Sequence, residues 1–184
     1  MLDREAKQNE GTGRETQESI ISRAVDDVKG ILDGDNPCSK FFGGSKGSLE
    51  ALGRLAALLK PGPIQDTKVG IRQDGAQSIF INAQTGFKYR LFANATVNNR
   101  GAFFTTFDVS SSPIKPLPNY GGFAPNTREV RAIMILHELA HLVYGSDGNP
   151  LIRNDKDDPN RSEENTRIVE KECGDLIRNL KVRK

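Results

Sequence analysis

The segment His137-Glu138-Leu139-Ala140-His141 contains both histidines of this chain, four residues apart. In an α-helix, residues i and i+4 lie on one face, so both imidazoles can bind one Zn²⁺ ion at about 2.0–2.1 Å. A glutamate directly after the first histidine is placed to take a proton from metal-bound water. The spacing therefore predicts that His137 and His141 are zinc ligands and that Glu138 is a general base.

The residues around this motif predict the helix that it needs. The segment Asn126-Thr127-Arg128-Glu129 supplies an N-cap followed by an acidic residue, and Gly145 is a suitable stop, which gives a helix of about 18 residues. Most positions between these ends are apolar, so we expect the helix to be buried on most of its surface. The two histidines should then lie in a dry setting rather than in solvent.

With these residues in one capped, apolar helix, the chain resembles the zincin superfamily of zinc metallopeptidases. The resemblance implies that His137 and His141 bind Zn²⁺, that Glu138 acts first as base and then as proton donor, and that the substrate is a peptide or protein. The chain also resembles small, uncharacterised bacterial proteins with an HELGH-type helix, a short Asp-Gly turn and a later helix with spaced Ser, Asn, Val and Cys. The matching positions are Asp147-Gly148, Ser162, Asn165, Val169 and Cys173.

A catalytic zinc ion normally takes a third protein ligand and keeps one coordination position open. Because the chain has no third histidine, a carboxylate or a similar group must supply it. Asp147 is our first candidate, because metzincins place their third ligand ten residues after the first histidine, although the glycine register differs and no methionine follows. Glu163, at the start of a predicted C-terminal helix, is the alternative in a gluzincin-like arrangement. Glu170, Asn165 and the absence of a third protein ligand are further alternatives.

Length and charge restrict the class of protein. The 184 residues fit one domain, which we expect to span residues 15–184 after a disordered segment, 1–14. With 26 basic and 24 acidic residues the net charge is +2, which does not recommend a nucleic-acid partner. The C-terminal basic residues suit the end of a helix. They are Arg178, Lys181, Arg183 and Lys184.

No apolar run is long enough to predict a membrane span, and the N-terminus lacks a signal-peptide core. The protein is therefore cytoplasmic, or it is secreted and the sequence begins after a removed leader. Cys38 and Cys173 are the only cysteines. They could form one disulfide in an exported protein or remain two buried thiols, and their spacing does not match a zinc-binding CxxC pair.

The remaining patterns predict an α+β fold in which two N-terminal helices and a small antiparallel sheet precede the helix that carries His137 and His141, called here the metal helix. The helices are expected at 15–32 and 47–60, and the strands at 69–71, 78–81, 87–92 and 102–107. The last strand is our candidate for a sheet edge that binds an extended peptide by β-augmentation. The loop 113–125 is expected to form a wall or lid of the cleft. Tyr120 and Tyr144 could stabilise an oxyanion, although a structural role is the simpler interpretation.

These patterns together predict a zinc-dependent metallohydrolase, a peptidase that uses water activated by Glu138. One alternative is a non-catalytic, zincin-like binding module, against which the presence of Glu138 argues. Another is an effector-type or toxin-type protease fragment of a secreted protein. The sequence carries no indication of the oligomeric state.

Overall fold

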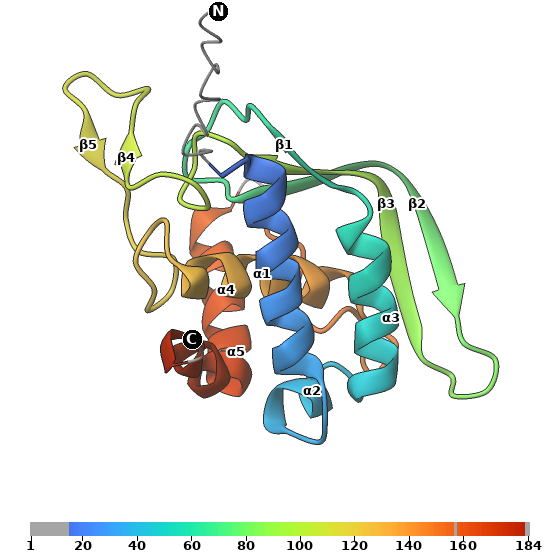
Figure 1. Cartoon of the computed structure of the whole chain (residues 1–184). Coiled ribbons are helices and arrows are strands. Elements are labelled where there is room, and N and C mark those ends of the chain that lie inside the picture. Colours follow the sequence, from blue (N-terminus) through green and yellow to red (C-terminus); the bar gives the residue numbers. More distant parts are fainter. Residues whose placement is uncertain (1–14, 157, 183–184) are drawn as a thin grey trace, which may run out of the picture.

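The computed structural model describes residues 15–156 and 158–182, so the predicted disorder of residues 1–14 lies outside the described part (Figure 1). Within that part, five α-helices accompany a three-stranded mixed sheet and a two-stranded sheet, which confirms the predicted α+β class. The elements are α1 (Gln17–Leu32), α2 (Pro37–Phe41), α3 (Ser45–Ala56), β1 (Leu59–Gly62), β2 (Ile71–Ile81), β3 (Lys88–Asn98), β4 (Phe107–Asp108), β5 (Lys115–Pro116), α4 (Arg128–Leu142), α5 (Pro159–Arg178) and a final 3₁₀ turn, Asn179–Val182.

The two predicted N-terminal helices are present as α1 and α3. Helix α1 begins after Thr16, whose hydroxyl accepts a hydrogen bond from the Ser19 amide at 3.2 Å, as an N-cap residue does. Helix α3 ends at Ala56, four residues earlier than predicted, because the chain then pairs with β3 as strand β1. Pro61, which has no amide hydrogen to donate, lies in this edge strand.

The main sheet has the order β1-β3-β2, with β2 antiparallel and β1 parallel to the central strand β3. The antiparallel pairing expected of the sheet is present between β2 and β3, whereas β1, which joins from the end of α3, adds a parallel strand that was not predicted. The predicted edge strand at 102–107 was wrong. Ala102 and Phe103 are buried, and their carbonyl oxygens accept hydrogen bonds from the Asn126 amide and the Arg131 side chain. Strands β1 and β2 form the two edges of the sheet instead.

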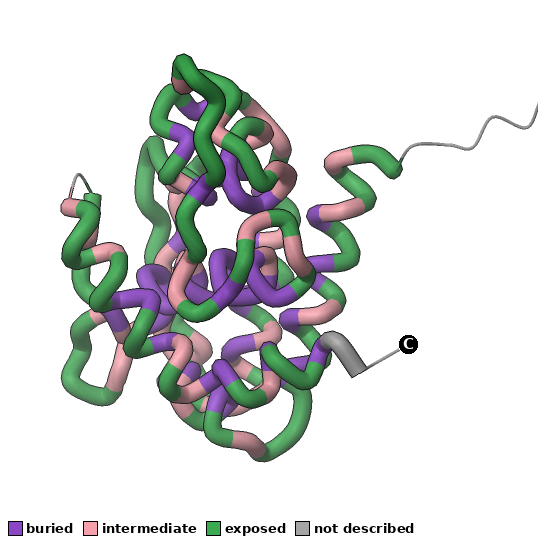
Figure 2. Tube along the Cα trace, turned by 90° about the vertical axis from the view of Figure 1, so that its left-hand side faces the viewer, coloured by how far each residue is buried: buried purple, intermediate pink, exposed green. Residues whose placement is uncertain are grey.

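Helix α4, which carries the histidine motif, crosses the middle of the molecule and packs against α1 and α5 (Figure 1). Twelve of its 15 residues are buried, and the buried positions gather at the centre of the fold (Figure 2). The turn before β2 comes so close to α4 that a Cβ atom on Gly70 would lie 2.7 Å from the Met134 sulfur. The prediction of a capped, largely buried helix is confirmed, with Thr127 as the N-cap residue. It ends at Leu142, before Gly145.

A disulfide joins Cys38 of α2 to Cys173 of α5, across a sequence separation of 135 residues. Both cysteines are fully buried. The bond ties the N-terminal helices to α5, the helix that packs on α4. Among the described residues, no helix is both long and apolar enough to cross a membrane, in agreement with the prediction.

Candidate metal centre

Three side chains from two parts of the chain converge at the C-terminal half of α4. The Nε2 atoms of His137 and His141 lie 3.1 Å apart. The two carboxylate oxygens of Asp155 lie 3.0 Å from His137 Nε2 and 3.1 Å from His141 Nε2. Both histidines are buried, and the Asp155 side chain is 17% exposed. The three residues form a group of the size and donor type that could hold a metal ion.

The donor atoms fit a zinc ion in both chemistry and spacing. At Zn–N and Zn–O distances of about 2.0–2.2 Å, the ligand atoms of a tetrahedral site lie about 3.3–3.6 Å apart. The observed separations of 3.0–3.1 Å are a few tenths of an ångström shorter, so small side-chain shifts would give the required geometry. Two imidazoles and one carboxylate leave a fourth position for water or substrate, as in catalytic zinc sites.

Thr166 of α5 determines which His137 nitrogen faces the other two donors. The Thr166 hydroxyl donates a hydrogen bond to the Ser162 carbonyl oxygen at 2.8 Å, and its oxygen lies 3.0 Å from His137 Nδ1. Because the hydroxyl hydrogen is engaged with Ser162, we infer that Nδ1 is the donor in the second contact. In the neutral tautomer this leaves the lone pair on Nε2, the atom that faces His141 and Asp155.

Replacement of Thr166 with valine should weaken zinc binding by about 10- to 100-fold, the usual effect of removing such an outer partner. Valine keeps the size and branching of threonine but offers no acceptor to His137 Nδ1. Chelator competition would measure the affinity, and Thr166→Ser, which retains the hydroxyl, should remain near wild type. Equal losses in the two variants would show that packing rather than the hydrogen bond matters.

Asp155 lies in the loop before α5, and the start of that helix holds the loop in place. The Asn165 side chain donates a hydrogen bond to the Arg153 carbonyl oxygen at 2.7 Å. The Arg161 side chain donates one to the Asn154 carbonyl oxygen at 3.2 Å. Burial opposes ionisation of Asp155, but the hydrogen bonds and charges of the two histidines outweigh it and hold the pKa of Asp155 well below its usual range. Asp155 is therefore an ionised carboxylate, the form that binds metal.

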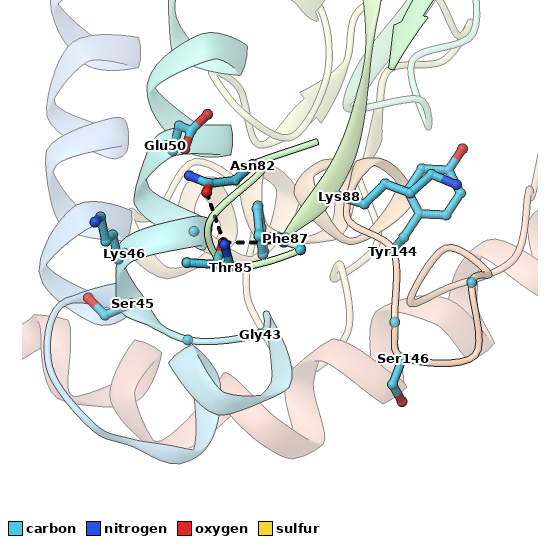
Figure 3. Close-up of a pocket in the computed structure, with 15 residues that line it drawn as sticks. Gly43, Ser45, Lys46, Glu50, Asn82, Thr85, Phe87, Lys88, Tyr144 and Ser146 are labelled. Carbon is cyan, nitrogen blue, oxygen red and sulfur yellow. Dashed lines mark hydrogen bonds between the residues drawn. The ribbon is translucent and has the colours of Figure 1, made fainter. Parts of the chain in front are cut away.

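Asp147, our first candidate for the third ligand, is not brought to the histidines. It lies in an exposed turn, where its carboxylate accepts hydrogen bonds from the Asn149 amide at 3.0 Å and the Asn149 side chain at 3.1 Å. Its neighbours Gly145, Ser146 and Gly148 line a different pocket of about 560 Å³, which lies between this turn, the start of α3 and the β2–β3 turn (Figure 3). Among the described residues, the carboxylate that the structure groups with the two histidines is therefore that of Asp155, and not that of Asp147.

The other candidates for the third ligand also have different partners. Glu163 is exposed and forms an ion pair with Arg167 one turn later. Glu170 accepts a hydrogen bond from the Gly122 amide at 3.0 Å and pairs with Arg178 at 2.7 Å. Asn165 holds the Asp155 loop, as described above, and so acts on the site indirectly.

Of the basic residues at the C-terminus, Arg178 forms an ion pair with Glu170. Residues 183–184 lie outside the described part.

Glu138 is half-buried beside the three donors. Burial raises the pKa of Glu138, and the neighbouring His137 and His141 partly offset this effect. The side-chain amide of Gln73, on β2, donates to Glu138 Oε2 at 2.8 Å and to the Glu138 carbonyl oxygen at 3.2 Å. The predicted base is therefore next to the candidate metal site and bonded to the edge strand.

The structure separates the two tyrosine candidates. The Tyr120 ring lies edge-on to the His137 ring, with centroids 5.9 Å apart, and burial followed by the charge of Glu138 raises the pKa of Tyr120 well above its usual value. Tyr144 lines the pocket of Figure 3, where the Lys88 ammonium lies 4.3 Å from its ring centroid. Only Tyr120 is placed against a member of the histidine pair, in the loop predicted to form a wall of the cleft.

Sequence reasoning missed Asp155 as a site residue. The available signal was the short acidic run Asp155-Lys156-Asp157-Asp158, directly before the Pro159 that begins α5. One member of this run, Asp158, is the N-cap residue of α5 and accepts a hydrogen bond from the Arg161 amide at 3.1 Å. A helix-capping role explains such a run equally well, so composition alone does not single out Asp155.

No protein-family model matches this chain, and neither the curated proteins nor the solved structures searched contain a match.

Proposed function

We propose that this protein is a zinc-dependent metallohydrolase whose metal ligands are His137, His141 and Asp155. The observation that carries the proposal is the convergence of two Nε2 atoms and one carboxylate, at mutual separations of 3.0–3.1 Å. Two imidazoles and one carboxylate form a donor set of catalytic zinc sites, and a purely structural site has no need of the adjacent Glu138.

The chain supplies the proton transfers that hydrolysis requires. When bound, Zn²⁺ would lower the pKa of a coordinated water toward ~7 and polarise a carbonyl group. Glu138 would take the proton from the attacking water and later deliver it to the leaving amine. The raised pKa of Glu138 suits both halves of this exchange, because a general acid–base works best when its pKa lies closer to the working pH.

The substrate proposed is an extended peptide. Strand β2 is an edge of the sheet, and its Gln73 contacts Glu138, so this edge passes the candidate metal centre. An edge strand can bind a peptide by adding it to the sheet through main-chain hydrogen bonds. Ile79 and Ile81 of the same strand are 58% and 64% exposed, which offers apolar contacts to such a peptide.

A non-catalytic binding module that holds structural metal is the alternative, and the low exposure of the donors supports it. His137 is 1% exposed and His141 8%. Both proposals require bound metal, and hydrolysis separates them. The buried disulfide supports an exported protein in either case, because disulfides persist in oxidising compartments.

Purified wild-type protein should contain about one zinc ion per chain, and His137→Ala should lose it, because the variant removes one of three proposed ligands. Elemental mass spectrometry would measure the metal, and digestion of fluorescein-labelled casein would measure peptidase activity. Arg167→Ala, a change on the exposed face of α5, is the control and should retain zinc. Folded wild-type protein that takes up no added zinc would contradict the proposal.

A further inference from the structure

Gln73 forms a contact between the edge strand and the proposed base, although 65 residues separate it from Glu138 in the sequence. Its side-chain nitrogen donates to the Glu138 carboxylate at 2.8 Å and to the Glu138 carbonyl oxygen at 3.2 Å. One amide group thus holds both the side chain and the backbone of the same residue. The contact fixes the carboxylate relative to helix α4.

A bulge in β2 determines that Gln73 rather than its neighbour Gln77 reaches the metal helix. Gln73 pairs with Ala95 of β3 and Gln77 pairs with Phe92, with a register shift between Asp74 and Gln77. Ala95 and Phe92 are three residues apart on one strand and so lie on opposite faces of the sheet. Paired residues share a face, so the two glutamines, which would share a face in a regular strand, point in opposite directions.

The conformation of the bulge depends on Gly75. This residue has a φ of 90°, which glycine adopts readily and other residues rarely do. A Cβ atom at Gly75 would also lie 3.0 Å from the Ala93 Cβ. The local sequence therefore supports the bulge that turns Gln73 toward Glu138.

The contact has a consequence for catalysis. A glutamate side chain has several rotamers, and a general base must lie within hydrogen-bond reach of the proton that it takes. A carboxylate has two oxygens, and Gln73 occupies Oε2, which leaves Oε1 to be directed at a water. A charged acceptor also makes this hydrogen bond stronger than a neutral one.

We propose that Gln73 is a positioning residue for the reaction, which holds the Glu138 carboxylate with Oε1 directed at the attacking water. The inference rests on the proposed hydrolase function. Gln73 acts through Glu138 and need not touch the substrate. Its loss should therefore lower kcat while KM and zinc content remain unchanged.

The test compares Gln73→Met with Gln84→Met in the full zinc-loaded chain. Methionine matches the length of glutamine but has no amide donor. Gln84 is an exposed residue in the turn between β2 and β3, outside the strand proposed to bind the peptide. A quenched fluorescent peptide selected by its cleavage by the wild type would give kcat and KM. We expect kcat to fall about 10- to 100-fold in Gln73→Met, as for loss of a hydrogen bond to a charged group, and to stay at the wild-type value in Gln84→Met.

A second readout does not depend on activity. The side-chain amide resonances of Gln73 should shift in Glu138→Ala, and those of Gln77 should not, in an NMR comparison with the wild type. An active wild type with equal kcat in the two methionine variants, or Gln73 resonances that ignore Glu138→Ala, would overturn the inference. An inactive wild type would instead refute the proposed function, and with it any catalytic role of Gln73.

Discussion

Replacement of Asp155 with alanine should lower zinc affinity by more than about 100-fold, beyond the loss typical of an outer-shell residue. Asp155 contributes the only carboxylate within the group of donors found in the described part of the chain. Without it, two neutral imidazoles would be the only protein donors, and neither would carry a negative charge to balance the divalent cation. The site would also lose one of its three proposed protein ligands, and a zinc site with only two protein ligands binds the ion weakly.

The matched control is Asp147→Ala, which removes the same side chain from an exposed turn eight residues earlier in the sequence. Zinc affinity would be measured by competition with a chelator of known affinity, and zinc content by elemental mass spectrometry. We expect Asp147→Ala to bind zinc like the wild type. Loss of zinc in Asp147→Ala together with retention in Asp155→Ala would contradict the structural assignment and restore the assignment made from sequence.

Glu138→Gln should retain zinc and lose hydrolysis. Glutamine has nearly the same shape as glutamate and keeps a carbonyl oxygen that can accept the Gln73 hydrogen bond, so the fold and the three donors should be preserved. It cannot take a proton from water. Since general acid–base catalysis contributes about 10²- to 10⁴-fold, we expect kcat to fall by that factor.

The measurement is the initial rate of peptide cleavage by zinc-loaded wild type and Glu138→Gln at equal metal content. Glu163→Gln makes the same chemical change on an exposed residue of α5 and should cleave at the wild-type rate. A Glu138→Gln variant as active as the wild type would show that another group acts as the base. An inactive wild type with intact zinc would support the non-catalytic binding module.

The local part of the site could be predicted from sequence, because it depends on helical periodicity. The spacing of His137 and His141 places their rings on one face of α4 wherever that helix lies, and the structure finds the two Nε2 atoms 3.1 Å apart. The apolar stripe of α1 and the buried position of Thr166 on α5 are also set by the repeat of each helix. Predictions of this kind require only the conformation of one continuous segment.

Only the tertiary structure decided the third donor. After α4 the chain pairs with β3 through Tyr89 and Val143, turns around Asp147 and returns. This path carries Asp147 outward and brings the loop before α5 back over the histidines. The number of residues from His137 therefore did not identify Asp155 as the nearby carboxylate. The place of Asp155 depends on contacts between separate segments, such as the hydrogen bond of Asn165 with Arg153.

The rest of the molecule shows the same difference between features of one continuous segment and contacts between distant segments. The sequence by itself determined the α+β class, the capped and buried helix α4, the histidine pair and the adjacent glutamate, because each follows from local composition and periodicity. The tertiary structure decided that Asp155 completes the donor set, that Gln73 contacts Glu138, and that Cys38 and Cys173 are bonded. These pairs are distant in sequence, and they form because packing of the buried helices and the bulge in β2 brings their side chains together.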